Sequence, residues 1–392
     1  MKSDKNKEIN NEYLLEKSDT KTDEINDIIF EKKIIILISK STNKDFANQL
    51  LNVLELAIFN KNLKEIKFEI KYFDNNNDLK NTIFKTKNKG RIYLGPIDSE
   101  FTKTVSDFCD QDVIFFSFSA NPSLAKDCVY LINFFPKNEL EELFKYLNKD
   151  SKVALLYPEN NYGYMINSLI DNVANESRAI IVNRSGYKND LSNVRDAIKE
   201  LGKYELRKYE LDRQKKLLST KNDNKSKQRL KKLEKFKTTT DYDFTHILIA
   251  DYGLNLLQVA PLLPFYDIDP NIVQFMATGV IDDENFFFEP SLQGAIFPGI
   301  HKKNRQDLIN KYRDLYNEKL MRVSTLPYDL VGLLNYIFSK KLTLQQLNEL
   351  LDNSSIKFEG VDGEFNFKNN IIERDLQILK ISNGVAAPIN FN

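Results

Sequence analysis

The chain has 392 residues, of which 42% are hydrophobic and 11% aromatic, so it is long enough to build two ordinary domains with cores of their own. It carries 56 basic and 56 acidic residues, and its formal net charge is zero. Because binding to a phosphate backbone requires a surplus of basic residues, this balance argues against nucleic acid as the main partner.

Residues 1–31 form a polar leader that is charged throughout and has no apolar run long enough for a secretory signal or a membrane span. We expect a disordered tether. It suits a mature exported protein whose signal and lipid-anchor cysteine have been removed, and the alternative is a cytoplasmic protein with a flexible start. The two cysteines, Cys109 and Cys128, do not settle the compartment. Their positions permit a disulfide, but we expect two small buried thiols.

The first part of the chain alternates between strand-like and helix-like segments. Apolar or alternating runs predict strands over residues 34–39, 66–73, 91–94 and 113–118, and helical spacing predicts helices over residues 43–60, 79–87 and 102–110. This alternation predicts a parallel sheet with crossover helices. The unit ends near Phe135-Pro136.

A second unit then repeats the same order. The pattern predicts helices over residues 137–148, 164–176 and 191–201, and strands over residues 152–157 and 179–184. Repetition of one α/β unit in a chain of this length predicts two lobes.

Residues 203–237 interrupt the second unit with fourteen Lys or Arg against five Asp or Glu, and only a thin apolar stripe. We interpret this segment as a basic helical arm inserted in lobe 2, and we expect it to protrude because it has too few apolar positions to be buried all round. It is either a docking surface for an acidic partner or anionic membrane headgroups, or a solvated hairpin that packs on its own lobe.

The alternation resumes after the arm. It predicts strands over residues 246–250, 272–277 and 295–298, helices over residues 254–264, 304–315 and 326–339, and a closing hairpin with strands over residues 363–367 and 374–380. We expect crossings near Phe135-Pro136, Pro298-Gly299 and Phe338-Lys341. Lobe 1 would then comprise residues 32–136 and 300–338, and lobe 2 residues 137–299 and 339–392.

This order of strands and turns, over about residues 32–381, resembles the type I periplasmic binding proteins of the leucine/isoleucine/valine-binding kind. Four stretches look closest to the alphaproteobacterial penicillin-binding-protein activator branch: YLGPIDSEFTKTVSDF, VIFFSFSANPSLA, APLLPFYDIDPNIVQFMATG and GVDGEFNFKNNIIERDLQIL. The charged arm before DFTHILIADYG is similar to that branch as well. The resemblance implies an α/β fold of two lobes, each a mostly parallel sheet flanked by helices, that hinge about three crossings.

The resemblance also implies a ligand site. Amino-acid receptors of this kind hold the carboxylate and ammonium of the ligand with polar turns at the carboxyl ends of strands. The corresponding positions here are Ser99, Ser117, Ser119, Asn121, Tyr162, and Asp282 or Asp283. Hydroxyl groups near a helix N-terminus suit a carboxylate, and an Asp suits an ammonium. We expect these side chains to meet in one inter-lobe space and to be partly exposed in the open form.

Some positions depart from the receptors or allow a plainer role. Residues 39–43, Ser-Lys-Ser-Thr-Asn, stand where the receptors have a Gly-containing turn, so part of the cleft wall differs. Ser99 equally suits a simple N-cap, and Tyr162 suits an aromatic packed in a turn between the lobes.

The sequence does not predict an enzyme. His246 and His301 have no catalytic partner in view, and neither a Gly-x-Ser-x-Gly elbow, a Lys-bearing phosphate loop nor a metal-ligand Cys spacing occurs. The paired carboxylates Asp282-Asp283 and Glu141-Glu142 are adjacent in sequence and therefore point apart or lie on solvated faces. We expect no cofactor and no metal.

Two binding functions remain. The first is a periplasmic protein, with or without a lipid anchor, that regulates a peptidoglycan synthase, as the activator branch implies. The second is a receptor that delivers amino acids to an ABC transporter. A receptor needs a complete polar cleft that closes on its hinge, whereas an activator can use its outer surface, so the altered first turn and the basic arm favour the activator. A cytoplasmic ligand sensor of the same fold is a third alternative.

Overall fold

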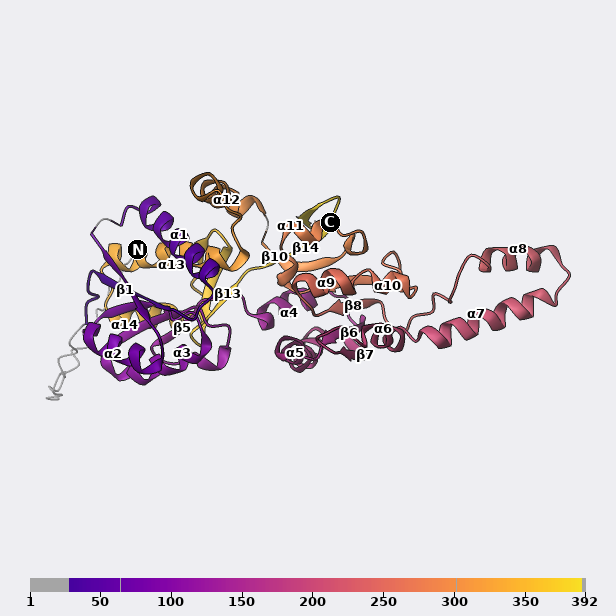
Figure 1. Ribbon diagram of the computed structural model, residues 1–392, viewed down its shortest axis with the longest axis horizontal. Coiled ribbons are helices and arrows are strands. Elements are labelled where there is room, and N and C mark those ends of the chain that lie inside the picture. The colour runs from indigo at the N-terminus through magenta and orange to yellow at the C-terminus, as the bar shows by residue number, and fades with distance from the viewer. Residues whose placement is uncertain (1–27, 64, 301, 390–392) are drawn as a thin grey trace, which may run out of the picture.

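The computed structural model describes residues 28–63, 65–300 and 302–389. Within them the chain forms two lobes, each a mostly parallel sheet flanked by helices, which confirms the predicted fold class (Figure 1). Residues 1–27 of the expected tether lie outside the described residues. Residues 28–31 differ from that expectation, because Phe30 is buried in the core of lobe 1 and Glu31 forms an ion pair of 2.6 Å with Arg91.

Lobe 1 is built on an eight-stranded sheet in the order β11-β12-β13-β5-β4-β3-β1-β2. Its strands are β1 (Lys33–Ser39), β2 (Lys67–Phe73), β3 (Arg91–Leu94), β4 (Val113–Ser117), β5 (Val129–Leu131), β11 (Phe358–Gly360), β12 (Gly363–Lys368) and β13 (Ile371–Arg374). Strands β1 to β5 pair in parallel, whereas β11, β12 and β13 pair with one another antiparallel. The five residues Ile34–Ile38 of β1 are all buried, as is typical of a strand covered on both faces.

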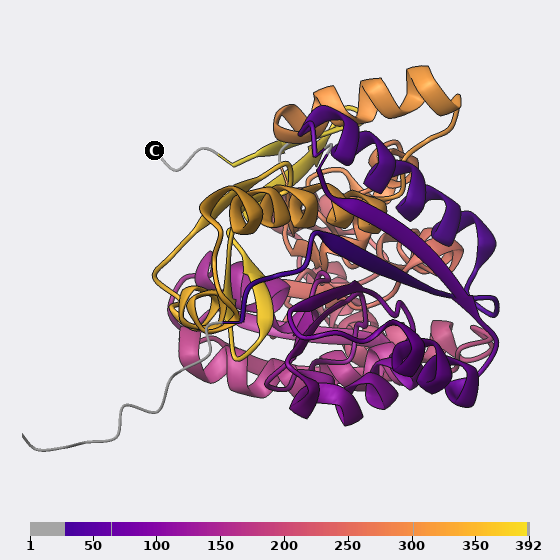
Figure 2. The ribbon, with the colours of Figure 1, turned by 90° about the vertical axis from the view of Figure 1, so that its left-hand side faces the viewer.

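Helices cover both faces of this sheet. They are α1 (Lys44–Asn60), α2 (Asn76–Thr86), α3 (Ser99–Val105), α13 (Leu326–Lys340) and α14 (Leu344–Asp352). Figure 2, which looks onto lobe 1, shows α1 and α13 together on one side of the sheet and α2 and α3 on the other. Asn43 begins α1, because its side chain accepts a hydrogen bond from the backbone N–H of Phe46.

Lobe 2 is built on a seven-stranded sheet in the order β15-β14-β10-β9-β8-β6-β7. Its strands are β6 (Lys152–Pro158), β7 (Ile180–Tyr187), β8 (His246–Ile249), β9 (Gln274–Ala277), β10 (Ile296–Gly299), β14 (Gln377–Ser382) and β15 (Val385–Pro388). The helices packed on it are α4 (Pro136–Lys145), α5 (Asn161–Ser177), α6 (Val194–Leu201), α9 (Gly253–Val259), α10 (Leu262–Phe265) and α11 (Glu284–Phe287). One hydrophobic core lies on each face of the sheet.

The chain crosses between the lobes between β5 and α4, after β10, and between β13 and β14. The third crossing therefore lies near Asp375-Leu376, and the prediction of a crossing near Phe338-Lys341 was wrong. Residues 339–374 stay in lobe 1, because Ile371 of β13 pairs with Leu131 of β5. The predicted closing hairpin was wrong for the same reason: β12 pairs with β13, while β14 joins the other sheet antiparallel to β10.

The helix α12 (Lys302–Tyr316) follows the second crossing and lies over it (Figure 1). It packs on lobe 1, where the side-chain amide of Asn52 in α1 donates to the hydroxyl of Tyr312 at 3.4 Å. The short 3₁₀ turn Arg322–Thr325 leads from α12 into α13.

Cys109 and Cys128 form a disulfide in lobe 1, with their Cα atoms 5.1 Å apart. The expectation of two separate thiols was wrong. The bond fastens the segment after α3 to the start of β5, two elements that the intervening β4 already holds close together.

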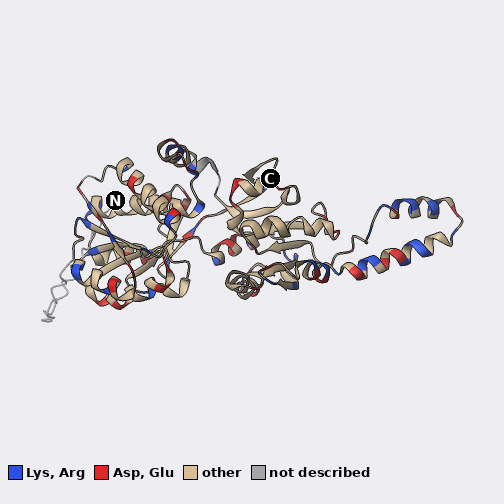
Figure 3. Cartoon of the chain, viewed as in Figure 1, with Lys and Arg blue, Asp and Glu red and all other residues tan. Residues whose placement is uncertain are grey.

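The arm is a hairpin of two helices, α7 (Tyr204–Ser219) and α8 (Asn224–Leu233), that extends away from lobe 2, as predicted (Figure 1). Its charges are mostly basic (Figure 3). Since residues 203–237 hold nine more basic than acidic residues and the whole chain is neutral, the rest of the chain carries the opposite excess. The arm therefore carries a net positive charge, and the rest of the chain carries a net negative charge.

Candidate functional site

The predicted serines of lobe 1 lie together at the carboxyl ends of β3 and β4. The hydroxyls of Ser99 and Ser119 are 2.7 Å apart, and that of Ser117 is 2.7 Å from the hydroxyl of Thr102 and donates to the carbonyl of Pro96. Ser117 and Ser119 are fully buried in this structure, whereas partial exposure was expected for the open form. Their hydroxyls bond to the chain itself instead of facing a ligand.

Ser99 is not the N-cap of its helix. That position belongs to Asp98, whose carboxylate accepts from the hydroxyl of Thr42 in the turn after β1. Asn121 is exposed and its side chain accepts from the backbone N–H of Ser123, which closes a local turn. We call Ser99, Ser117 and Ser119 the serine cluster. Of these residues and Asn121, only Ser99, which is half-buried, and Asn121, which is exposed, are accessible.

Tyr162 lies in the first turn of α5, at the carboxyl end of β6. Its hydroxyl is 2.5 Å from that of Thr278, which follows β9, and its ring meets the edge of Tyr252 at a centroid distance of 5.2 Å. Burial raises the pKa of Tyr162 above the ordinary value of a phenol. The neighbouring Gly163 is required by a close approach, since a Cβ there would lie 1.9 Å from the carbonyl oxygen of Pro158.

Asp282 and Asp283 follow β9 but face the crossings. Asp282 lies 3.7 Å from a guanidinium nitrogen of Arg305 and 4.0 Å from one of Arg322. Asp283 caps α11 and forms an ion pair of 2.7 Å with Lys319. Both carboxylates line a cavity of about 440 Å³, whose walls include none of the predicted serines and not Tyr162.

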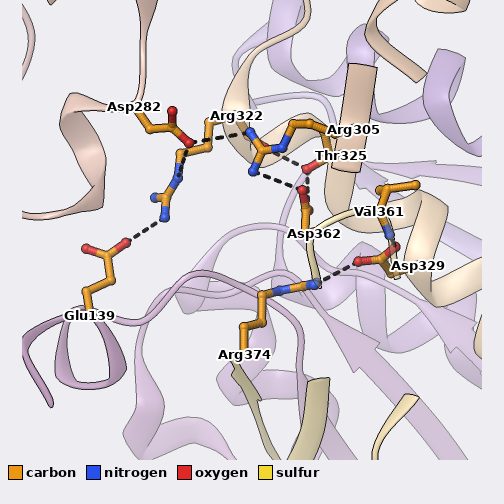
Figure 4. A network of polar contacts seen from close by, with 9 residues as sticks. All are labelled: Glu139, Asp282, Arg305, Arg322, Thr325, Asp329, Val361, Asp362 and Arg374. Carbon is orange, nitrogen blue, oxygen red and sulfur yellow. Dashed lines mark hydrogen bonds and ion pairs between the residues drawn. The ribbon is translucent and has the colours of Figure 1, made fainter. Parts of the chain in front are cut away.

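A network of buried ion pairs, which we call the hinge network, joins the lobes at the crossings (Figure 4). Arg322, on the lobe 1 side, donates to Glu139 of α4 in lobe 2 at 2.8 Å, and the other oxygen of Glu139 accepts from the backbone N–H of Gly279. Burial raises the pKa of Asp282, while Arg305 and Arg322 oppose that shift. These contacts hold lobe 2 carboxylates against lobe 1 guanidiniums.

The hinge network continues into lobe 1. Arg305 pairs with Asp362 at 2.9 Å, and Asp362 accepts from the hydroxyl of Thr325. Arg374 donates to Asp329 at 2.7 Å, and both side chains are only 1% exposed. Burial raises the pKa of Asp329 even against the neighbouring guanidinium.

Sequence reasoning missed the hinge network. Asp362 and Arg374 both lie in the stretch GVDGEFNFKNNIIERDLQIL, where charged residues stand among strand-forming apolar ones. That placement was the available signal, because a charge in a buried strand needs a partner. Arg305 and Arg322 gave no such signal, since a single Arg in or beside a helical segment is usually solvated.

The predicted site residues therefore form three separate groups: the serine cluster with Asn121, Tyr162 with Thr278, and the two Asp residues at the crossings. Among the described residues, no hydrogen bond or ion pair connects one group to another. The lobes also face each other across a groove of about 200 Å³, lined by residues that include Pro122, Phe135, Met165, Leu169 and Ile372. That groove is mainly apolar.

The described part of the chain shows no metal site. It contains no group of three or more His, Cys, Asp or Glu residues placed to hold a metal ion. His246 starts β8, its Nδ1 is 2.8 Å from the hydroxyl of Thr245, and burial lowers its pKa. His301 lies outside the described residues.

The two lobes match the two-lobed α/β fold of the periplasmic binding proteins. The chain has a TM-score of 0.66 and 10% identity to a branched-chain amino acid ABC transporter periplasmic ligand-binding protein from Burkholderia xenovorans LB400, covering 91% of this chain and 94% of that one. Against LpoA of Haemophilus influenzae the TM-score is 0.61 at 15% identity, covering 92% of this chain and 58% of that one.

In sequence, the chain is 23% identical to the uncharacterized protein RP748 of Rickettsia prowazekii (strain Madrid E) over 301 residues, which are 76% of this chain and 71% of that protein. No protein-family model matches the chain. None of the helices in the described residues is both long and apolar enough to cross a bilayer.

Proposed function

We propose that this protein is a non-enzymatic, periplasmic binding-fold protein that regulates peptidoglycan synthesis as a penicillin-binding-protein activator. The observation that carries the proposal is that the side chains a receptor would offer to an amino acid are engaged with the chain itself. Ser117 and Ser119 are fully buried, and Asp282 faces two guanidiniums. LpoA, one of the proteins with a similar fold, is such an activator.

The hinge network supports the same role. Closing a receptor requires the lobes to turn about their crossings. Here the pair of Glu139 with Arg322 ties the lobes beside the crossings, and both side chains are largely buried, so a motion that separated them would leave a buried charge uncompensated. Lobes held in this way present a fixed outer surface, which suits docking to a partner better than capture of a solute.

Two further observations support a periplasmic location. The disulfide between Cys109 and Cys128 is of a kind that persists in oxidising compartments such as the bacterial periplasm. A protein of the same fold is named as a periplasmic ligand-binding protein. A lipid anchor upstream of the described residues belongs to the same proposal.

The arm supplies a surface for contact with the envelope. In α8 the exposed cations Lys225, Lys227, Arg229, Lys231 and Lys232 form no ion pair with any described residue. Unpaired cations on a projecting hairpin attract anionic partners, and their reach shortens as salt rises. We propose that the arm docks on an acidic face of the synthase or on anionic headgroups of the membrane.

The test is a pull-down of the organism's penicillin-binding peptidoglycan synthases by the purified protein, alongside vesicles with and without anionic lipid. We expect capture of a synthase, and we expect high salt to weaken it. Replacing Lys225, Arg229 and Lys232 with Gln should also weaken capture, whereas exchanging Lys for Arg and Arg for Lys at these positions keeps the charge and should not. Failure to capture a synthase at any salt concentration would contradict the proposal.

The alternative is a receptor for amino acids of the leucine, isoleucine and valine type. It is favoured by the position of Ser99, Asn121 and Tyr162 at the carboxyl ends of strands, where ligands bind in this kind of sheet. Calorimetry with a panel of amino acids separates the two functions. Heat that disappears in Tyr162→Phe and Ser99→Ala would establish the receptor, and no heat with any amino acid supports the regulator.

A further inference from the structure

The cavity beside the crossings has a polar end and an apolar wall. Asp282, Arg305 and Arg322 lie at the polar end, and Figure 4 shows one guanidinium nitrogen of each arginine joined to the Asp282 carboxylate by a dashed line. The apolar wall comes from α11, α12, the loop before α13 and the last two strands. It includes Phe287, Ile300, Ile309, Leu320, Leu379 and Val385. A volume of about 440 Å³ is within the range of sites that hold a small molecule.

The polar end is incompletely bonded. The Nε atoms of Arg305 and Arg322 are buried and donate no hydrogen bond within the described residues, and Oδ2 of Asp282 accepts none. The separations of 3.7 and 4.0 Å between that oxygen and the two guanidiniums exceed hydrogen-bond length. Since the side chain of Arg305 is only 7% exposed, bulk water does not fully compensate its free donor.

We propose that this cavity binds a small amphipathic carboxylate, whose carboxylate group bridges Arg305 and Arg322 and whose hydrocarbon body lies along the apolar wall. A carboxylate presents two oxygens and can accept from a guanidinium N–H of each arginine, and both arginines line the cavity. The apolar wall then buries hydrocarbon, at about 25 cal/mol for each Å² removed from water. This site does not depend on the proposed regulatory function.

Asp282 is the competitor of such a ligand. The charged groups nearest to it are Arg305 of α12, Arg322 before α13 and Asp362 between β11 and β12. Arg322 also pairs with Glu139 of α4. The other charged residues that line the cavity are Asp283, Glu284, Arg313, Glu318 and Lys319. A bound anion repels the Asp282 carboxylate and favours its protonated form, which burial already favours by raising its pKa. Binding therefore takes up a proton and strengthens as pH falls.

This mode of binding differs from that of an amino-acid receptor. There, Asp282 would attract the ammonium of the ligand, and its removal would abolish binding. Here, Asp282 opposes the ligand, and Asp282→Asn strengthens binding because the guanidiniums lose their competing charge. The same substitution thus has opposite effects under the two hypotheses.

The experiment is titration calorimetry of the full chain with sodium octanoate and with octanamide, a neutral analogue of the same length. We expect octanoate to bind at least about tenfold more tightly than octanamide, because only the anion gains from the guanidiniums. Ile309→Trp, which fills the apolar wall without changing charge, should weaken octanoate binding by a similar factor. Lys357→Met, on the surface outside the cavity, should leave it unchanged.

Arg305→Gln should also abolish the preference for octanoate over octanamide, and its thermal unfolding is measured in parallel because Arg305 belongs to the hinge network. If that variant does not fold, Ile309→Trp and Asp282→Asn still decide the matter. Equal affinity for the two probes, weaker binding in Asp282→Asn, or no heat from octanoate at millimolar concentration would each overturn the proposal.

Discussion

The hinge network and the arm are both built from charged residues, yet they use charge in opposite ways. In the hinge network, guanidiniums and carboxylates are buried and paired, as in Arg374 with Asp329. In the arm, most cations are exposed, and the described ion pairs within it are few, such as Arg213 with Glu210 on the same helix. Burial decides the difference: a buried charge fixes the position of its partner, whereas an exposed one adds to a field that salt screens.

The largest effect is expected from breaking the buried pair. Arg374→Met leaves the Asp329 carboxylate buried with no guanidinium, and we expect a loss of about 3–5 kcal/mol in the free energy of unfolding. Chemical denaturation measures it. Lys357→Met is the matched control, because Lys357 pairs with Glu364 and Asp375 on the surface, where such pairs contribute at most about 1 kcal/mol.

The double variant Arg374→Met with Asp329→Asn sharpens this result. The amide oxygen of Asn can still accept from the backbone N–H of Val361, which Asp329 now holds at 2.6 Å, and neither position of the pair then carries a charge. We expect it to recover part of the lost stability. Equal loss in the double and single variants would mean that packing, not the uncompensated charge, dominates.

Arg207 tests the comparison inside the arm, because it is the arm's buried cation. Its guanidinium donates to the carbonyls of Gly202 at 2.7 Å, Thr239 at 2.8 Å and Tyr266 at 3.2 Å, and burial lowers its pKa. Arg207→Met leaves these acceptors without donors, so we expect a loss of about 2–3 kcal/mol in unfolding experiments.

The control is Arg213→Met, six residues along the same helix, where the side chain is exposed and pairs only with Glu210. We expect a loss of less than about 1 kcal/mol there. A similar loss in both variants would show that burial does not decide what a cation contributes in this protein.

The fold was predictable where local pattern is decisive. Continuous apolar runs predicted β1 and β6, and Asn43 marked the start of α1. The third crossing was not predictable, because it depends on β13 pairing with β5, and the pair Ile371–Leu131 is 240 residues apart in sequence. No local period reports such a pairing, so the pattern could not say which sheet received the last strands.

The candidate site shows the same limit. The serines were correctly placed at strand ends, but the chain pattern did not reveal that the hydroxyls of Ser99 and Ser119 bond to each other. Arg322 is a stronger case, since its role depends on Glu139, 183 residues away in sequence. Residue type and local position were predictable, and mutual partners were not.

The smallest effect is expected from the exposed cations of α8. Lys225, Arg229 and Lys232 lie on one side of the helix at spacings of four and three residues, and none forms an ion pair with a described residue. Replacing all three with Gln should change the free energy of unfolding by less than about 0.5 kcal/mol, with a slight gain at low salt as repulsion between them is relieved.

Denaturation at low and high salt checks both points, because any gain in stability should vanish when the Debye length falls to about 3 Å at 1 M salt. A loss above about 1 kcal/mol would instead mean that these side chains make stabilising contacts with the body of the protein, and the contrast with the hinge network would fail.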